Sequence, residues 1–74
     1  MNQTLKSIGK RIRVTRIERE MSQSELAIEA GTDKSRISKI ENGASVVGIL
    51  LFVDICRALK VNPNDILGSD FIDN

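Results

Sequence analysis

Four polar side chains that could bind a polyanion follow Asp33 in close succession: Lys34, Ser35, Arg36 and Lys39. If this segment is a helix, these side chains lie on the side away from its apolar residues. Lysine and arginine donate hydrogen bonds to phosphate oxygens and to guanine, and serine bonds to several base edges. The row is therefore suited to contact a nucleic acid duplex. The simpler alternative is a solvated helix face.

Two short helices joined by a tight turn are predicted to position these side chains. The first begins after Ser22, because Ser22 and Glu25 form an S-x-x-E capping box. Gly31 is expected to end it with a positive φ. Asp33 is a favourable N-cap for the second helix, at 34–41. Such a pair, with a glycine in its short turn, is typical of a helix-turn-helix, which lays its second helix in the major groove of DNA.

Apolar periodicity predicts three further helices. They are expected at about 5–19, at 49–59, and in a short last turn that begins at Asn62 with Pro63 in its first helical position. The side chains expected to face inward are Leu5, Ile8, Ile12, Thr15, Leu26, Ala27, Ala30, Ile37, Ile40, Ile49, Phe52, Ile55, Cys56, Leu59, Ile66 and Leu67. Strand signals are weak, so the sequence predicts an all-α fold. We expect a single domain, residues 1–74, with a core at about 5–67 and a short tail at 68–74.

The composition argues against several classes of function. The chain has 74 residues, one cysteine and no histidine, so it can form no internal disulfide and no Cys/His zinc site. Its longest apolar stretch, 46–53, is far shorter than the roughly 20 residues of a membrane span, and its N-terminus does not resemble a signal peptide. No nucleophile has a neighbouring base. We therefore expect a cytoplasmic, non-enzymatic protein without a cofactor.

Charge is unevenly distributed along the chain. The formal net charge is only +1, but residues 1–43 hold nine basic and six acidic residues, whereas 44–74 hold two and four. The stretch 6–19 alone carries six cations against one acidic residue. A basic half and an acidic half suggest a polyanionic partner on one side. A solvated helix face would also explain the pattern if it stood alone.

Several short stretches together resemble the phage-repressor-like, Cro/Xre-type helix-turn-helix family. They are Ile8-Gly9-Lys10-Arg11-Ile12-Arg13, Arg16, Met21-Ser22-Gln23, Leu26-Ala27, Gly31, Ile37-Ser38-Lys39-Ile40-Glu41-Asn42-Gly43 and Ala58-Leu59-Lys60-Val61. The resemblance spans about residues 5–67. It implies a compact, lambda-repressor-like fold of five helices that binds palindromic operators in double-stranded DNA as a homodimer.

The resemblance also implies roles for individual residues. Base contacts would fall on Lys34, Ser35 and Lys39. Phosphate contacts would fall on Ser22, Gln23, Arg36 and Asn42. A structural ion pair would join Arg16 and Glu41. Three positions depart from the family pattern: Thr15 stands where a large apolar residue is common, Glu20 where glycine is usual, and Val47 where proline is frequent.

Apolar residues at 49–59 exceed what one buried face requires. Leu50, Leu51 and Val53 therefore suggest a surface for a partner, and we expect a two-fold dimer there, joined by Phe71 and Ile72 of the tail. Val14 and Ile17 form a rival surface. An alternative function uses the same surface for another protein, as in an antitoxin or a protein-interaction module.

Overall fold

The computed structural model describes residues 3–67, which form five helices and no strand. The helices are α1 (Gln3–Glu18), α2 (Gln23–Ala30), α3 (Lys34–Glu41), α4 (Ile49–Leu59) and α5 (Pro63–Leu67). The predicted all-α fold is confirmed. The observed bounds differ from the expected ones only in α1, which begins and ends slightly earlier than 5–19. None of these helices is long and apolar enough to cross a bilayer.

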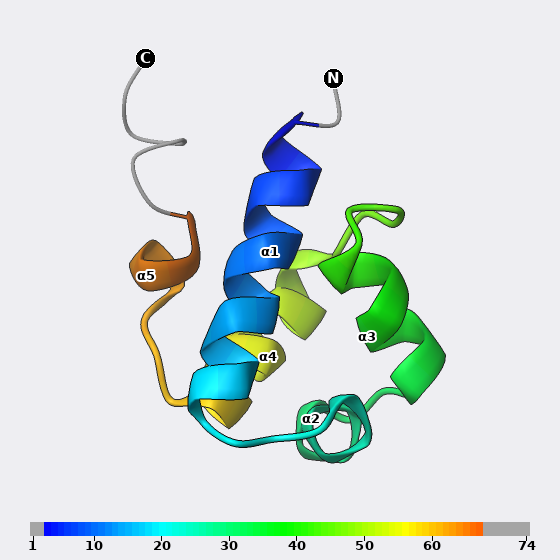
Figure 1. Cartoon of the computed structure of the whole chain (residues 1–74), viewed down its shortest axis with the longest axis vertical. Coiled ribbons are helices and arrows are strands. Elements are labelled where there is room, and N and C mark those ends of the chain that lie inside the picture. The colour runs from blue at the N-terminus through cyan, green and yellow to red at the C-terminus, as the bar shows by residue number, and fades with distance from the viewer. Residues whose placement is uncertain (1–2, 68–74) are drawn as a thin grey trace.

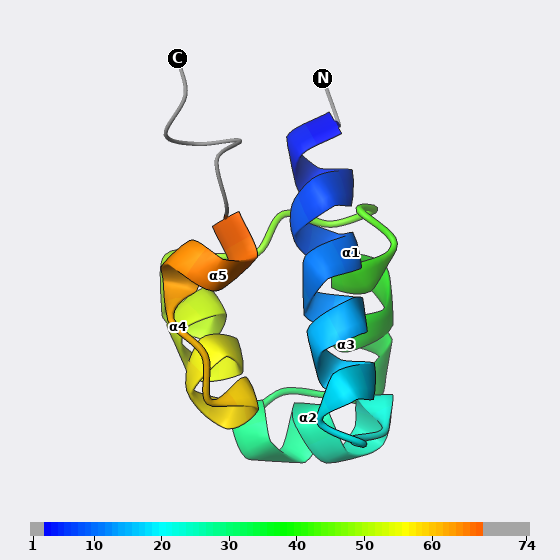
Figure 2. The ribbon, with the colours of Figure 1, turned by 60° about the vertical axis from the view of Figure 1, so that its left-hand side comes forward.

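The longest helix, α1, runs through the centre of the molecule with α3 on one side and α5 on the other (Figure 1). A second view separates α1 and α3 from α4 and α5, with α2 across the end between the two pairs (Figure 2). Every helix contributes to the apolar core between them, which consists of Ile8, Ile12, Leu26, Ala27, Ala30, Ile37, Ile40, Phe52, Ile55, Cys56, Leu59 and Ile66. The core therefore holds α3 from behind along its inner face.

Local capping fixes the start of α2 and both ends of the turn between α2 and α3. The Glu25 backbone N–H donates to Ser22 Oγ at 3.0 Å, and the Ser22 N–H donates to the Glu25 carboxylate at 2.7 Å, which completes the predicted capping box. Gly31 ends α2 with φ +77°. The Asp33 carboxylate accepts from the Arg36 N–H at 2.8 Å and caps α3. The predicted start and stop signals of this unit are confirmed.

Ile49 was expected in the buried face of α4, and this expectation is wrong. Its side chain is 72% exposed, whereas Phe52, Ile55, Cys56 and Leu59 are buried. Ile49 is the first residue of α4. Side chains in a helix lean towards its N-terminus, so this one projects past the end of the core instead of into it.

Gly9 allows a close approach between α1 and α3. A Cβ atom at this position would collide with the backbone carbonyl oxygens of Ile40 and Glu41. The backbone of α1 therefore lies directly against the last turn of α3, with no side chain between them. Glu20 adopts φ +57° in the turn after α1, so a non-glycine residue takes the left-handed conformation that the resemblance associates with glycine.

Candidate nucleic-acid interface

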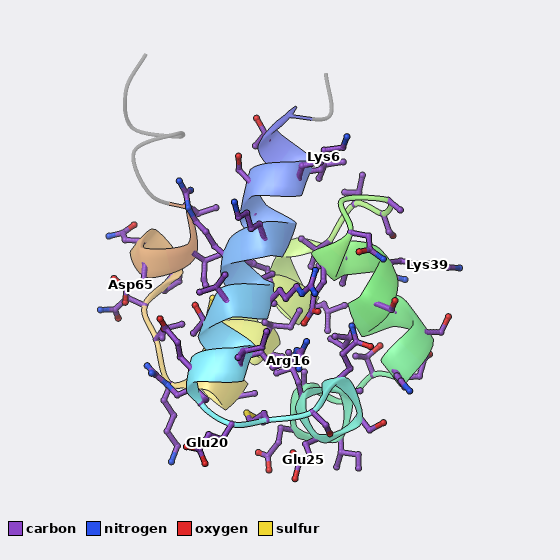
Figure 3. All side chains as sticks on the ribbon, in the orientation of Figure 1. Lys6, Arg16, Glu20, Glu25, Lys39 and Asp65 are labelled. Atoms are coloured by element: carbon purple, nitrogen blue, oxygen red, sulfur yellow. The ribbon has the colours of Figure 1, made fainter. Side chains whose placement is uncertain are left out.

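The outer side of α3 carries the cationic row, and its inner side carries the anchors. Lys34, Ser35 and Lys39 are exposed, while Ile37 and Ile40 are buried in the core. Lys39 points away from the body of the molecule (Figure 3). The exposed side chains line one open hollow together with Asp33 and Arg36. Cations from both ends of α3 therefore share a face that a duplex could approach.

The N-terminus of α2 lies close to the C-terminal end of α3. Gln23, the first residue of α2, donates from its side-chain Nε2 to Glu41 Oε1 at 3.0 Å. This contact gives Gln23 a partner inside the protein that the sequence did not predict. The Ser22 hydroxyl oxygen accepts within the capping box, which leaves its proton available to an outside acceptor.

Arg16 and Glu41 form a buried pair behind this region. Arg16 Nε donates to Glu41 Oε2 at 2.7 Å, and Arg16 Nη2 donates to Oε1 at 3.1 Å. The Glu41 side chain is 1% exposed and that of Arg16 12%. Arg16 Nη1 also donates to the Met21 carbonyl oxygen at 2.8 Å, so one guanidinium joins α1, the turn before α2, and α3. Figure 3 places Arg16 in the interior between these elements.

Two more arginines, Arg11 in α1 and Arg19 in the turn just after it, also serve the fold, which the charge pattern alone did not reveal. Arg11 Nη1 donates to the Leu67 carbonyl oxygen at 2.8 Å, at the end of α5. Arg19 Nε donates to the Leu59 carbonyl oxygen at 2.9 Å, at the end of α4. Cations at helix C-termini donate to the free carbonyl oxygens there and interact favourably with the negative end of the helix dipole. The basic stretch 6–19 is therefore partly structural.

Lys6 is a candidate that the sequence did not single out. It is exposed, and its Cγ would lie 2.7 Å from a Cβ built on Gly43, just past the end of α3. Asn42, the expected phosphate contact at this end, is exposed as well and forms the C-cap of α3. Lys6 and Asn42 are far apart in the chain, so only the packing of α1 on α3 reveals that they share one region.

A second surface, apolar in character, surrounds the N-terminal end of α4. Leu50 is 79% exposed and Val46 68%, while Leu51 and Val53 are half-buried. Beside them is an apolar hollow of about 250 Å³ lined by Ile8, Val47, Ile49, Phe52 and Leu67. Phe71 and Ile72, also expected in a dimer interface, lie outside the described residues. The rival surface on α1 is exposed too, since Val14 and Ile17 are 46% and 55% accessible.

Two observations concern metal and thiol chemistry in the described part of the chain. Within residues 3–67, no group of His, Cys, Asp and Glu side chains could hold a metal ion. The thiol of Cys56 is buried in the core, and this burial, together with the negative charge of Asp65, raises its pKa. A raised pKa disfavours the reactive thiolate, so Cys56 acts as a packing residue.

Comparison with known sequences identifies one domain family. The family model described as "Helix-turn-helix domain" matches residues 9–68. Antitoxin PezA of Streptococcus pneumoniae is 36% identical over 63 residues, 85% of this chain. The HTH-type transcriptional regulator y4dL of Sinorhizobium fredii is 40% identical over 54 residues, 73% of this chain. The chain spans only 40% and 28% of the lengths of these two relatives.

Solved structures of bacterial regulators share the fold. The restriction–modification controller protein C.AhdI of Aeromonas hydrophila superposes with a TM-score of 0.85 at 28% identity, over 88% of this chain and 94% of that one. The clp gene regulator ClgR of Corynebacterium glutamicum superposes with a TM-score of 0.83 at 25% identity, over 86% and 83%. Both similarities extend over nearly all of the described helices.

Proposed function

Because this chain belongs to the Cro/Xre-type helix-turn-helix family of DNA-binding transcription regulators, we propose that it binds a palindromic operator as a homodimer. Helix α3 enters the major groove, where Lys34, Ser35 and Lys39 contact base edges. Phosphate contacts come from Ser22, Gln23, Arg36 and Asn42. The observation that carries the proposal is the two-sided character of α3, with cations exposed on one side and isoleucines buried on the other.

The division between base and phosphate contacts is tested by alanine substitution. An operator is first selected from a random DNA pool, and affinities for it and for a random duplex are then measured by fluorescence anisotropy. Lys34→Ala should cost about 1–3 kcal/mol on the operator and relax base preference. Arg36→Ala should weaken both duplexes to a similar degree and reduce the salt dependence. Equal losses on both duplexes for Lys34→Ala would refute its base-reading role.

A matched control separates local contacts from net charge. Arg57 is exposed on α4, where it pairs only loosely with Asp54 at 3.7 Å. Arg57→Ala removes the same charge as Lys34→Ala but from a different element. It should therefore change operator affinity much less than either α3 substitution. A loss as large as that of Lys34→Ala would show that overall charge, not the face of α3, determines binding.

The dimer proposal is supported by the surface at the start of α4. A two-fold interface must be self-complementary, because each copy presents the same patch. This patch offers both a protruding apolar side chain, Leu50, and the apolar hollow beside it. Such a dimer would place its two α3 helices on half-sites about 34–36 Å apart. Sedimentation equilibrium tests it: Leu50→Glu should give a monomer, whereas Ile17→Glu should remain dimeric.

The similarity to antitoxin PezA favours a second candidate, in which the α4 surface binds another protein and DNA binding is secondary. The two candidates differ in the behaviour of the purified chain. The regulator should dimerise alone and shift DNA from upstream of its own gene in a mobility-shift assay. A chain that remains monomeric and shifts no such DNA would favour the protein-interaction function.

A further inference from the structure

We propose that Glu41 is a positioning residue for DNA binding: its carboxylate, neutralised by Arg16, orients the side-chain amide of Gln23 towards the DNA backbone. The inference rests on the proposed phosphate contact of Gln23. It assigns to Glu41 a role beyond stabilising the fold, although Glu41 is buried and touches no DNA itself. The three side chains come from different helices, α1, α2 and α3.

The contacts form a continuous chain from the core to the N-terminus of α2. Arg16 donates to both carboxylate oxygens of Glu41, at 2.7 and 3.1 Å, and Gln23 Nε2 donates to Oε1 at 3.0 Å. Oxygen Oε1 thus accepts from two donors at once. A carboxylate accepts at both oxygens, whereas an amide at this position would set a donating NH₂ group in place of one oxygen, against either Arg16 Nε or the pair Arg16 Nη2 and Gln23 Nε2. The carboxylate is therefore the group that can accept from all three donors.

This arrangement fixes the orientation of the Gln23 amide. An amide nitrogen carries two protons, and the contact with Glu41 uses one of them. The second proton remains for an acceptor outside the protein, close to the N-terminus of α2, where backbone N–H groups favour anions. A side chain held in its binding conformation loses less conformational entropy when DNA arrives. Preorganisation of one neutral donor is therefore the benefit expected from Glu41.

Charge balance makes an acidic residue acceptable beside a phosphate site. A bare carboxylate 3.0 Å from the Gln23 amide would repel an approaching phosphate. The guanidinium of Arg16 lies against that carboxylate and is itself nearly buried, so the pair has no net charge. The same guanidinium holds the Met21 carbonyl oxygen in the turn before α2. Arg16 thus fixes both the carboxylate and the segment that leads into the proposed phosphate site.

A double-mutant cycle tests the inference. Gln23→Ala, Glu41→Gln and the double variant are compared with wild type by operator affinity, and thermal unfolding is measured in parallel. Gln23→Ala should weaken binding roughly tenfold to one-hundredfold, as expected for one lost hydrogen bond to a charged group, and Glu41→Gln should weaken it by no more than that. If Glu41 acts through Gln23, Glu41→Gln should have almost no further effect in the Gln23→Ala background. A double variant whose loss equals the product of the single losses would overturn the inference.

The sign of the Glu41→Gln effect is a second criterion. Removing a negative charge near DNA should strengthen binding if only long-range electrostatics operate. The positioning role requires weaker binding instead. Tighter binding of folded Glu41→Gln would therefore overturn it. If Gln23→Ala leaves affinity unchanged, the phosphate contact itself is wrong and the role of Glu41 falls with it, whereas additive losses overturn only the role of Glu41.

A measurement on the wild-type chain keeps the inference testable even if Glu41→Gln fails to fold. The side-chain NH₂ group of Gln23 gives two proton signals in a ¹H–¹⁵N spectrum. The proton bound to Glu41 should exchange with solvent more slowly than those of the exposed amide of Asn64. Exchange as fast as that of Asn64 would show that the amide is not held, and would overturn the inference.

Discussion

Substitution of Gly9 by alanine tests whether direct backbone contact between α1 and α3 limits the stability of the fold. A methyl group there would lie 2.7 Å from the Glu41 carbonyl oxygen and would also overlap that of Ile40. Both obstacles are backbone atoms, which cannot rotate away as a side chain would. The two helices must therefore separate by about 1 Å to restore ordinary contact.

The expected magnitude follows from two opposing effects. Overpacking a close contact costs about 1–3 kcal/mol, while alanine is favoured over glycine inside a helix by about 1 kcal/mol. Because the obstacle is rigid on both sides, the upper part of the first range applies. The net loss should be about 1–2 kcal/mol. In a domain of this size, that lowers the melting temperature by roughly 5–15 °C.

Circular dichroism during thermal unfolding measures this loss. Gly48→Ala is the matched control for the added methyl group, because no atom lies within 4 Å of a Cβ built there; its expected cost is only the N-cap preference for glycine over alanine, about 0.5–1 kcal/mol. Operator affinity of Gly9→Ala at a temperature where it is still folded reports whether α3 has moved. A Gly9→Ala protein as stable as wild type would refute the close-contact reasoning.

Two further predictions concern groups that the fold uses internally. Arg19→Ala removes the donor to the Leu59 carbonyl oxygen and should destabilise the chain by about 1 kcal/mol in urea unfolding. Arg13→Ala, at an exposed position within α1, should have little effect. The pKa of the Cys56 thiol is raised in the fold above its ordinary value of 9.0, so the folded state favours the neutral thiol. The stability that Cys56 contributes should therefore be present below pH 9.0 and decline as the pH rises above it. Urea unfolding of wild type and Cys56→Ala at pH 8 and pH 10 checks this, and an equal pH dependence in both would contradict it.

Local signals predicted the helix-turn-helix unit well because capping chemistry operates over three or four residues. Ser22 with Glu25, Gly31 and Asp33 each act on their own helix end, so their effect is readable from the sequence. The outward position of the cationic row followed equally from the periodicity of Ile37 and Ile40. These parts of the fold and of the candidate site required no knowledge of the tertiary contacts.

The features that sequence reasoning missed all depend on contacts between distant segments. Gly9 is required by the passage of α1 over α3, and the Gln23–Glu41 contact by the meeting of two helix ends. The internal role of Arg19 depends on where α4 ends. Ile49 satisfied the periodicity, but periodicity does not tell how far the core extends along a helix. A single sequence without tertiary contacts cannot supply this information.

The separation between the two sides of α3 also bears on how regulators of this kind could diverge. The buried isoleucines hold the helix against the core, while the exposed residues are the ones that we propose to meet DNA. Replacement of Lys34, Ser35 and Lys39 should therefore alter target choice without disturbing the scaffold. A small library randomised at these three codons would offer a direct route to regulators that act side by side in one cell without cross-talk.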